Sequence, residues 1–272
     1  MRYENRQPPE GINVVEHGWA RDFILLVIGF FAGLALLCWL LLQLVAWSAK
    51  WTPFSWEQAL TQSWTLDEQP GEQQRYLQQL ADQLAQAGGL SPELTLQVRY
   101  SEDDTINAFA TLGGNMMIFE GLVDAVDSEQ GLAFVIAHEI AHIQHRHPVQ
   151  AVARGLSMSL VSAMIFGQTD LAQLAGVGGN LALLNYSRQQ ENEADRWALQ
   201  ALHNHYGHVA GADELFRKLK EENNGLVLPE WMSTHPDLDA RIANMERIAL
   251  DNGYELNGEL LPINSSYKTP QQ

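Results

Sequence analysis

The strongest chemical signal in the sequence is the pentapeptide His138-Glu139-Ile140-Ala141-His142, which follows the HExxH pattern. On a helix, residues i and i+4 lie one turn apart on the same face, so both imidazoles can bind one Zn²⁺ ion. Glu139 points about 100° further around the helix axis, where its carboxylate can act as a general base. The pattern therefore predicts a hydrolytic site that holds one zinc ion per chain.

A catalytic zinc ion needs a third protein ligand, and the sequence offers candidates on two helices. His145 lies a further turn along the first helix and is poorly placed. The extended metzincin pattern requires glycine at position 145 and histidine at position 148, so His145 and Pro148 exclude that class. In the later segment SRQQENEAD, Glu191 and Asp195 share a helix face from which Glu193 points away. One of these two acids can bind the metal while the other accepts a hydrogen bond from a ligand histidine.

Four segments, in the same order, resemble a family of membrane-associated zinc endopeptidases. The family includes the CAAX prenyl proteases, HtpX, the OMA-type proteases and the bacterial β-barrel-assembly-enhancing protease. The segments are INAFATLGGNMMIFEGL, HEIAHIQHRHP, SRQQENEAD and STHPDLDARI, and they span about residues 100–250. The resemblance implies a zincin-type metallopeptidase domain in which Glu191 is the third zinc ligand and Asp195 hydrogen-bonds a ligand. One departure is that HtpX-like and prenyl-protease members carry several membrane spans.

The resemblance also points to two regions beyond the zinc ligands. His235 in STHPDLDARI could bind the open zinc position and keep the site latent, assist the oxyanion, or cap a helix. The segment Met116, Met117, Ile118 and Phe119 resembles the family's edge strand, to which an extended substrate could add; a purely structural hairpin is the alternative. Weaker candidates for transition-state stabilisation are Tyr186, Arg188, His205 and Arg241. The histidines read as surface or structural residues are His145, His147, His203 and His208.

The elements before the HExxH segment form a helix and a small sheet. Apolar residues at helical spacing predict a helix over 72–87, and alternation over 94–100 predicts a strand. Residues 105–111 and 116–119 flank Gly113-Gly114 and predict a hairpin with a tight turn.

Helices follow, and their order after a small sheet predicts a mainly helical α+β domain. The HExxH helix is expected over about 128–146 with Asp127 as its cap. The last helix is expected from Pro236 to about Leu250, with Thr234 or His235 as its cap. Other helices are expected over 149–167, 181–203 and 211–223, with a glycine-rich break at 176–179.

A long apolar segment precedes this domain. Residues 23–49 contain no charged side chain, and a helix from Phe23 to Trp47 would reach about 38 Å, enough to cross a bilayer. Arginines at positions 2, 6 and 21 precede the segment and only Lys50 follows closely, which places the N-terminus in the cytoplasm. Aromatic residues expected at the lipid interface are Trp47, Trp51, Phe54, Trp56 and Trp64. The predicted organisation is a tail over 1–22, a transmembrane helix over 23–49, a linker over 50–71 and a metallopeptidase domain over 72–272.

Composition narrows the partners and the chemistry of the site. The chain has 33 acidic and 16 basic residues and a net charge of −17, which argues against nucleic acid as a partner. Cys38 is the only cysteine, so the sequence has no cysteine-based zinc site.

These features favour a membrane-anchored zinc metalloendopeptidase. The expected location is a bacterial inner membrane, with the catalytic domain periplasmic and with unfolded or misassembled envelope proteins as substrates. One alternative is a non-catalytic adaptor that keeps the protease fold and binds extended peptides, although such a module has no use for Glu139. Another is a protease that acts on membrane substrates at the lipid surface, supported only by the tryptophans after the span.

Overall fold

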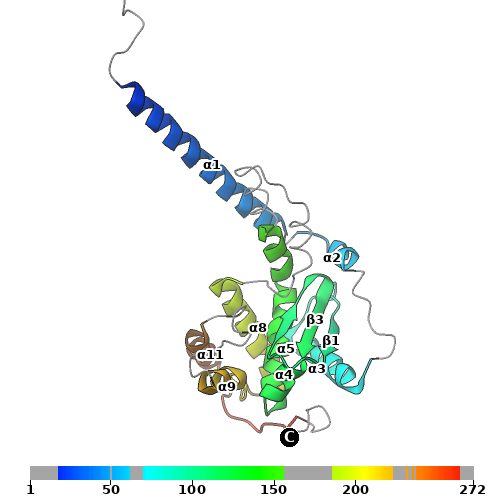
Figure 1. Ribbon diagram of the computed structural model, residues 1–272. Coiled ribbons are helices and arrows are strands. Elements are labelled where there is room, and N and C mark those ends of the chain that lie inside the picture. The colour runs from blue at the N-terminus through cyan, green and yellow to red at the C-terminus, as the bar shows by residue number, and fades with distance from the viewer. Residues whose placement is uncertain are drawn as a thin grey trace, which may run out of the picture. The chain divides into compact units, whose positions relative to one another are not determined.

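The computed structural model describes residues 18–49, 51–61, 70–155, 186–222, 231, 235 and 237–263. The chain divides into two compact units, residues 1–44 and 45–272, and each is described by itself (Figure 1). The predicted tail up to residue 17, Trp64, most of the expected helix over 149–167 and the glycine-rich break lie outside the described residues.

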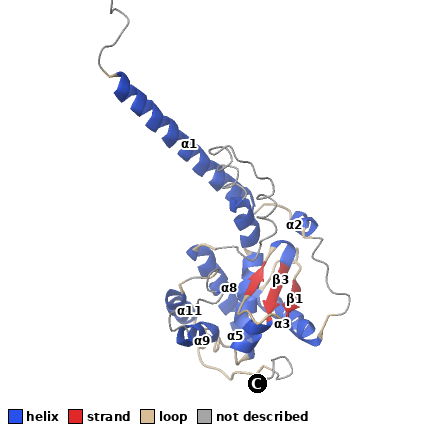
Figure 2. Cartoon of the chain, in the orientation of Figure 1, coloured by secondary structure: helices blue, strands red, loops and turns tan. Residues whose placement is uncertain are grey.

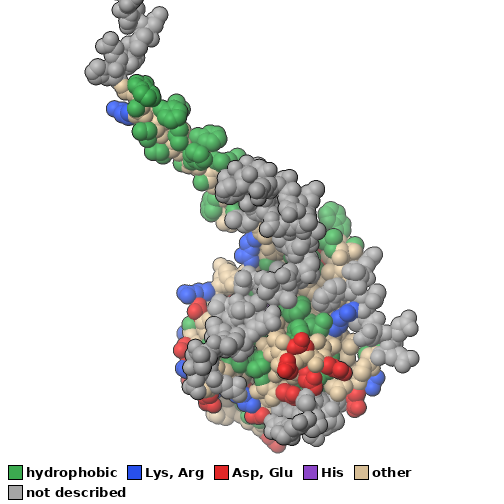
Figure 3. Space-filling view, in the orientation of Figure 1, with side chains coloured by type: hydrophobic (Ala, Val, Ile, Leu, Met, Phe, Trp, Pro, Cys, Tyr) green, Lys and Arg blue, Asp and Glu red, His purple; other side chains and the backbone are tan. Residues whose placement is uncertain are grey.

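Helix α1, Trp19–Ala49, contains the predicted membrane span and begins four residues before it. Its part from Trp19 to Leu44 is long and apolar enough to cross a membrane. Large apolar side chains are exposed around the helix, including Phe23 at 63% and Leu26 at 73%, and Figure 3 shows them along its length. A helix that is apolar on all faces is typical of a membrane span when it is not buried in a protein core.

The second unit contains a three-stranded sheet, coloured red in Figure 2. Its strands are β1 (Gln97–Ser101), β2 (Ala108–Ala110) and β3 (Asn115–Phe119), in the order β1-β3-β2. Strand β1 is parallel to β3, and β2 is antiparallel to it. The prediction that Met116–Phe119 forms an edge strand is therefore wrong, because β3 is central and pairs on both sides. The hairpin itself is confirmed.

The hairpin turn depends on glycine. The 3-10 turn η1, Leu112–Gly114, joins β2 to β3, and Gly113 and Gly114 both have φ above +70°. A Cβ atom on Gly114 would lie 1.8 Å from the carbonyl oxygen of Thr95. The turn is therefore closed by a backbone approach that only glycine permits.

Helix α5, Glu129–Gln144, is buried along almost its whole length, and it carries the HExxH residues. Its N-cap is Ser128, whose Oγ accepts a hydrogen bond from the Gly131 N–H at 3.0 Å. Asp127 was the predicted cap, but its side chain pairs with Lys218 at 2.6 Å. The chain then turns at Arg146, which has φ +59°, and residues 147–155 are helical again.

The remaining helices surround α5 and the sheet. They are α2 (Phe54–Leu60), α3 (Glu72–Gly88), α4 (Glu120–Ala125), α8 (Arg188–Tyr206), α9 (Glu214–Glu222) and α11 (Leu238–Asn252). Helix α8 packs against both α5 and α3, and apolar side chains from these helices and the sheet form one core. The predicted mainly helical α+β domain with a small sheet is confirmed.

Some predicted boundaries and placements were wrong. Helix α8 begins at Arg188, behind a capping box formed by Ser187 and Gln190, rather than at 181. The N-cap of α11 is Asp237, in the left-handed region at φ +70°, rather than Thr234 or His235. Phe54 is buried against the Arg146 guanidinium rather than available to lipid, whereas Trp47, Trp51 and Trp56 are exposed.

Candidate metal centre

Two helices and one residue just before α11 bring together four side chains that could hold a metal ion. Helix α5 supplies His138 and His142, whose Nε2 atoms lie 3.0 Å apart. Helix α8 supplies Glu191, whose carboxylate oxygens lie 3.5 Å from His138 Nε2 and 3.6 Å from His142 Nε2. With His235 included, one donor atom from each residue lies within 4.8 Å of all the others, and all four residues are buried.

The donor set fits a divalent transition metal. Bonds of about 2.0–2.1 Å in a tetrahedral site place neighbouring donor atoms roughly 3.3 Å apart. Five of the six separations among His138, His142, Glu191 and His235 run from 3.0 to 3.6 Å, and all six are within 4.8 Å. Nitrogen and oxygen donors of this kind suit zinc and related ions.

A buried carboxylate supports His138 directly. This carboxylate belongs to Asp195, whose Oδ1 lies 3.0 Å from His138 Nδ1. Arg241 donates to both oxygens of Asp195, with Nε 3.0 Å from Oδ2, and its Nη1 lies 2.8 Å from Glu191 Oε2. Burial and the Arg241 charge lower the pKa of His138, but hydrogen bonds to Asp195 and Glu191 outweigh them and raise it to about 9. These hydrogen bonds therefore favour the protonated form of His138.

His142 has different neighbours. Its Nδ1 atom lies 2.8 Å from His147 Nδ1, and the Tyr186 ring stacks on its imidazole at 3.9 Å between centroids. Burial, helped by the positive charge on His138, holds the pKa of His142 well below its ordinary value. His147 was read as surface or structural, but it is buried and contacts this ligand.

Glu139 lies beside the cluster with its two oxygens in different environments. Oε2 accepts a hydrogen bond from the Ala110 N–H at 2.8 Å. Oε1 has no hydrogen-bond partner among the described residues and lies 3.4 Å from His235 Nε2. Burial raises the pKa of Glu139 above its ordinary value, while His235 and His138 act in the opposite direction. An oriented carboxylate with one oxygen free of hydrogen bonds is suited to accept a proton.

His235 completes the cluster. Its Nδ1 atom lies 3.0 Å from Glu191 Oε2 and 3.3 Å from His138 Nε2, and its ring stacks on Trp231. Because the ring is buried among the donors and Asp237 caps α11, the helix-cap interpretation of His235 was wrong.

Residues 71–249 match the sequence model of peptidase family M48. The chain belongs to peptidase family M48. The resemblance found in the sequence is thereby confirmed at the level of the family.

The curated proteins that resemble this chain match it over only part of their own length. It is 30% identical to the beta-barrel assembly-enhancing protease of Yersinia pestis over 155 residues, 52% of this chain and 32% of that protein. The corresponding Escherichia coli K12 protein is 32% identical over the same lengths. The mitochondrial metalloendopeptidase OMA1 of Schizosaccharomyces pombe is 31% identical over 175 residues, 63% of this chain and 51% of that protein. The chain thus spans about a third to a half of these relatives.

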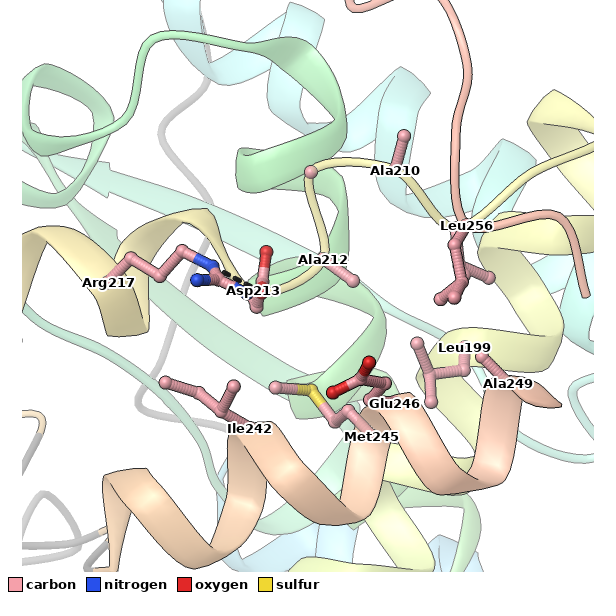
Figure 4. Close-up of a pocket in the computed structure, with 12 residues that line it drawn as sticks. Leu199, Ala210, Ala212, Asp213, Arg217, Ile242, Met245, Glu246, Ala249 and Leu256 are labelled. Carbon is pink, nitrogen blue, oxygen red and sulfur yellow. Dashed lines mark hydrogen bonds and ion pairs between the residues drawn. The ribbon is translucent and has the colours of Figure 1, made fainter. Parts of the chain in front are cut away.

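Of the weaker candidates, only Tyr186 and Arg241 lie at the M48 site. Arg188 is exposed and pairs with Asp237, and His205 is exposed near the end of α8. A pocket of about 220 Å³ lies between α11 and residues 209–213 (Figure 4). Its lining includes Met245 and the Asp213–Arg217 ion pair but no member of the donor cluster, so it is not the metal site.

Proposed function

We propose that this chain is a zinc-dependent metalloendopeptidase. The observation that carries the proposal is Glu139, a buried carboxylate with one oxygen that accepts no hydrogen bond from the described residues, placed against four side chains that could hold a metal ion. In this proposal His138, His142 and Glu191 hold one zinc ion, and Asp195 orients His138. Family membership supports the reaction class, and the nitrogen and oxygen donors favour zinc over a hard cation such as magnesium.

The residues around the metal divide the work of peptide hydrolysis. A bound zinc ion would supply a Lewis acid that polarises the scissile carbonyl at neutral pH. Glu139 Oε1 takes the proton from the attacking water and passes it to the leaving amine. The Ala110 N–H holds Glu139 Oε2, so the free oxygen keeps a fixed direction toward the cluster.

Strand β2 replaces β3 as the proposed edge for substrate. Asn107 and Thr111 exchange backbone hydrogen bonds with β3, at 3.2 Å and 2.8 Å. Backbone groups alternate along an antiparallel strand, so those of Ala108 and Ala110 point away from β3. One of them, the Ala110 N–H, already bonds Glu139, which puts this edge beside the base. An extended peptide added there would present its carbonyl groups near the cluster.

His235 keeps the site latent in this proposal. It lies where a fourth donor would bind. One turn earlier, the backbone N–H of Trp231 donates to the backbone oxygen of Ile106, beside β2, at 3.4 Å. A substrate would therefore displace His235 before its carbonyl could reach the metal. We expect His235→Ala to increase cleavage of an unfolded protein several-fold at equal zinc content. A decrease at equal zinc content would contradict latency and favour assistance of the oxyanion.

We further propose that α1 anchors the chain in a bacterial inner membrane, with its N-terminus cytoplasmic and its catalytic domain periplasmic. The apolar length of α1 and the excess of arginine before residue 23 support this topology. The proposed substrates are unfolded or misassembled envelope proteins. The name of the Yersinia relative, a beta-barrel assembly-enhancing protease, supports that class.

The deciding experiment uses the full chain purified in detergent. Zinc content and cleavage of unfolded casein are measured beside Glu139→Gln, which removes the base but no ligand. We expect about one zinc per chain in both proteins and cleavage only in the wild type. Zinc without cleavage in the wild type and in His235→Ala would favour the non-catalytic adaptor. Absence of bound zinc in the wild type would refute the proposal.

A further inference from the structure

A line of hydrogen-bonding side chains leads outward from His142. His142 Nδ1 lies 2.8 Å from His147 Nδ1, and His147 Nε2 lies 3.3 Å from Glu193 Oε2. His147 is buried, whereas the Glu193 side chain is 41% exposed. The line therefore connects a candidate ligand in the interior with a carboxylate at the surface.

The proton positions along this line are determined by its chemistry. His142 Nε2 faces the other donors, so a metal-bound His142 carries its proton on Nδ1. That N–H donates to His147 Nδ1, which leaves the proton of a neutral His147 on Nε2. His147 Nε2–H then donates to the Glu193 carboxylate. Each nitrogen thus has one role, and a single pair of tautomers satisfies every contact.

The backbone turn after α5 makes this contact possible. On an uninterrupted helix, His147 would lie about 140° around the axis from His142 and could not face it. The chain instead passes through Arg146 at φ +59°, a conformation that is unfavourable for a residue with a side chain. Arg146 is held there by Glu57 Oε1, 2.8 Å from its Nε, and by the Thr52 carbonyl oxygen.

We propose that His147 and Glu193 are positioning residues that fix the tautomer and ring orientation of His142 and thereby increase the affinity of the site for its metal ion. The inference rests on the proposed zinc site. Removing such an outer partner of a metal-binding histidine usually weakens metal affinity about 10- to 100-fold.

The test measures zinc affinity by competition with a chelator, using the full chain in detergent. We expect His147→Leu, which removes the acceptor, to weaken zinc binding about 10- to 100-fold. His147→Asn places an amide oxygen near the position of Nδ1 and should recover most of that loss. Glu193→Gln keeps an oxygen but removes the charge, and should weaken binding by a factor of about 3–10. The matched control, His203→Asn, changes a half-buried histidine that stacks on Tyr254, away from the line, and should stay within about twofold.

Two further readouts separate positioning from packing. The visible spectrum of the Co²⁺-substituted protein should change in His147→Leu and return toward wild type in His147→Asn, while thermal unfolding of the metal-free proteins changes little. Zinc affinity of His147→Leu within twofold of wild type would overturn the inference, as would equal losses in the Leu and Asn variants. If His147→Leu does not fold, unchanged affinity in Glu193→Gln overturns it. A wild type that binds no zinc would instead refute the proposed function on which the inference rests.

Discussion

His138 and His142 lie four residues apart on the same helix, both fully buried, yet their surroundings differ. His138 faces Asp195 directly, and Arg241 fixes that carboxylate in the interior. His142 contacts the His147 imidazole and the Tyr186 ring. The carboxylate on this side, Glu193, is partly exposed and contacts His147 rather than His142. The pKa of His138 is raised to about 9, whereas that of His142 is held well below its ordinary value.

The difference shows that helix position alone does not determine the behaviour of a candidate ligand. Burial lowers the pKa of both rings, but hydrogen bonds to Asp195 and Glu191 raise that of His138 in spite of it. The raised pKa of His138 favours a proton on that ring before a metal ion binds. A metal ion must displace it, whereas His142 is already neutral and available to bind.

The largest expected effect comes from removing the cation on the His138 side. Arg241→Leu leaves the buried carboxylates of Asp195 and Glu191 without their guanidinium partner, which should cost about 3–5 kcal/mol of unfolding free energy. Urea unfolding of the metal-free chain in detergent measures this loss. Saturating zinc should reduce it, because the ion supplies positive charge to the same carboxylates.

The matched control is Arg188→Leu, which breaks an exposed ion pair with Asp237. That pair should contribute less than about 1 kcal/mol. Equal losses in the two arginine variants would show that the His138 side is not the electrostatic anchor that the contacts indicate.

A smaller effect should appear as a pH dependence of the metal-free protein. Because the folded pKa of His138 is raised to about 9, its stabilising contribution is complete below its ordinary pKa near 6.5 and is lost as pH rises toward 9. We expect unfolding free energy to fall by on the order of 1–3 kcal/mol between pH 6.5 and 9. Glu191 and Asp195, whose pKa values are lowered, remain ionised throughout this window and contribute no slope.

Asp195→Asn tests the origin of that slope. The amide retains an oxygen for the His138 Nδ1–H but removes the negative charge that favours a second proton, so the dependence between pH 6.5 and 9 should flatten. Zinc affinity of the wild type should increase over the same range, because binding releases the proton from His138. A metal-free stability that stays constant or increases toward pH 9 would contradict the assigned proton position.

The sequence was most informative where one helix determines the geometry. Spacing of i and i+4 predicted that His138 pairs with His142 and Glu191 with Asp195, because both pairs lie within unbroken helices. It also suggested that an acid would meet a ligand histidine, and Asp195 lies 3.0 Å from His138.

The errors arose where a tertiary contact or a local break decides the outcome. His147 lies five residues from His142, and only the turn at Arg146 lets them meet; no periodicity in the sequence indicates that turn. The central position of β3 depends on β1, which pairs with it in parallel outside the hairpin. Arg241 reaches Asp195 across 46 residues, and its charge gave no sign of a buried partner. The nearest available signal was the position of Arg241 within the HPDLDAR segment.

The smallest expected effect concerns the ring that covers His142. Tyr186 stacks on the imidazole with an interplanar angle of 19°, and its hydroxyl has no hydrogen-bond partner among the described residues. Tyr186→Phe keeps the stacked ring and removes only that hydroxyl, so zinc affinity should stay within about twofold and stability within about 0.5 kcal/mol. Tyr186→Leu removes the aromatic face and should weaken zinc binding more than the Phe variant does.

If Tyr186→Phe weakened binding as much as Tyr186→Leu, the hydroxyl rather than the ring would support His142, and the contrast between a carboxylate-held and a ring-covered histidine would fail. A kcat that falls at least tenfold in Tyr186→Phe, with KM and zinc affinity unchanged, would instead assign the hydroxyl to transition-state stabilisation and leave that contrast intact.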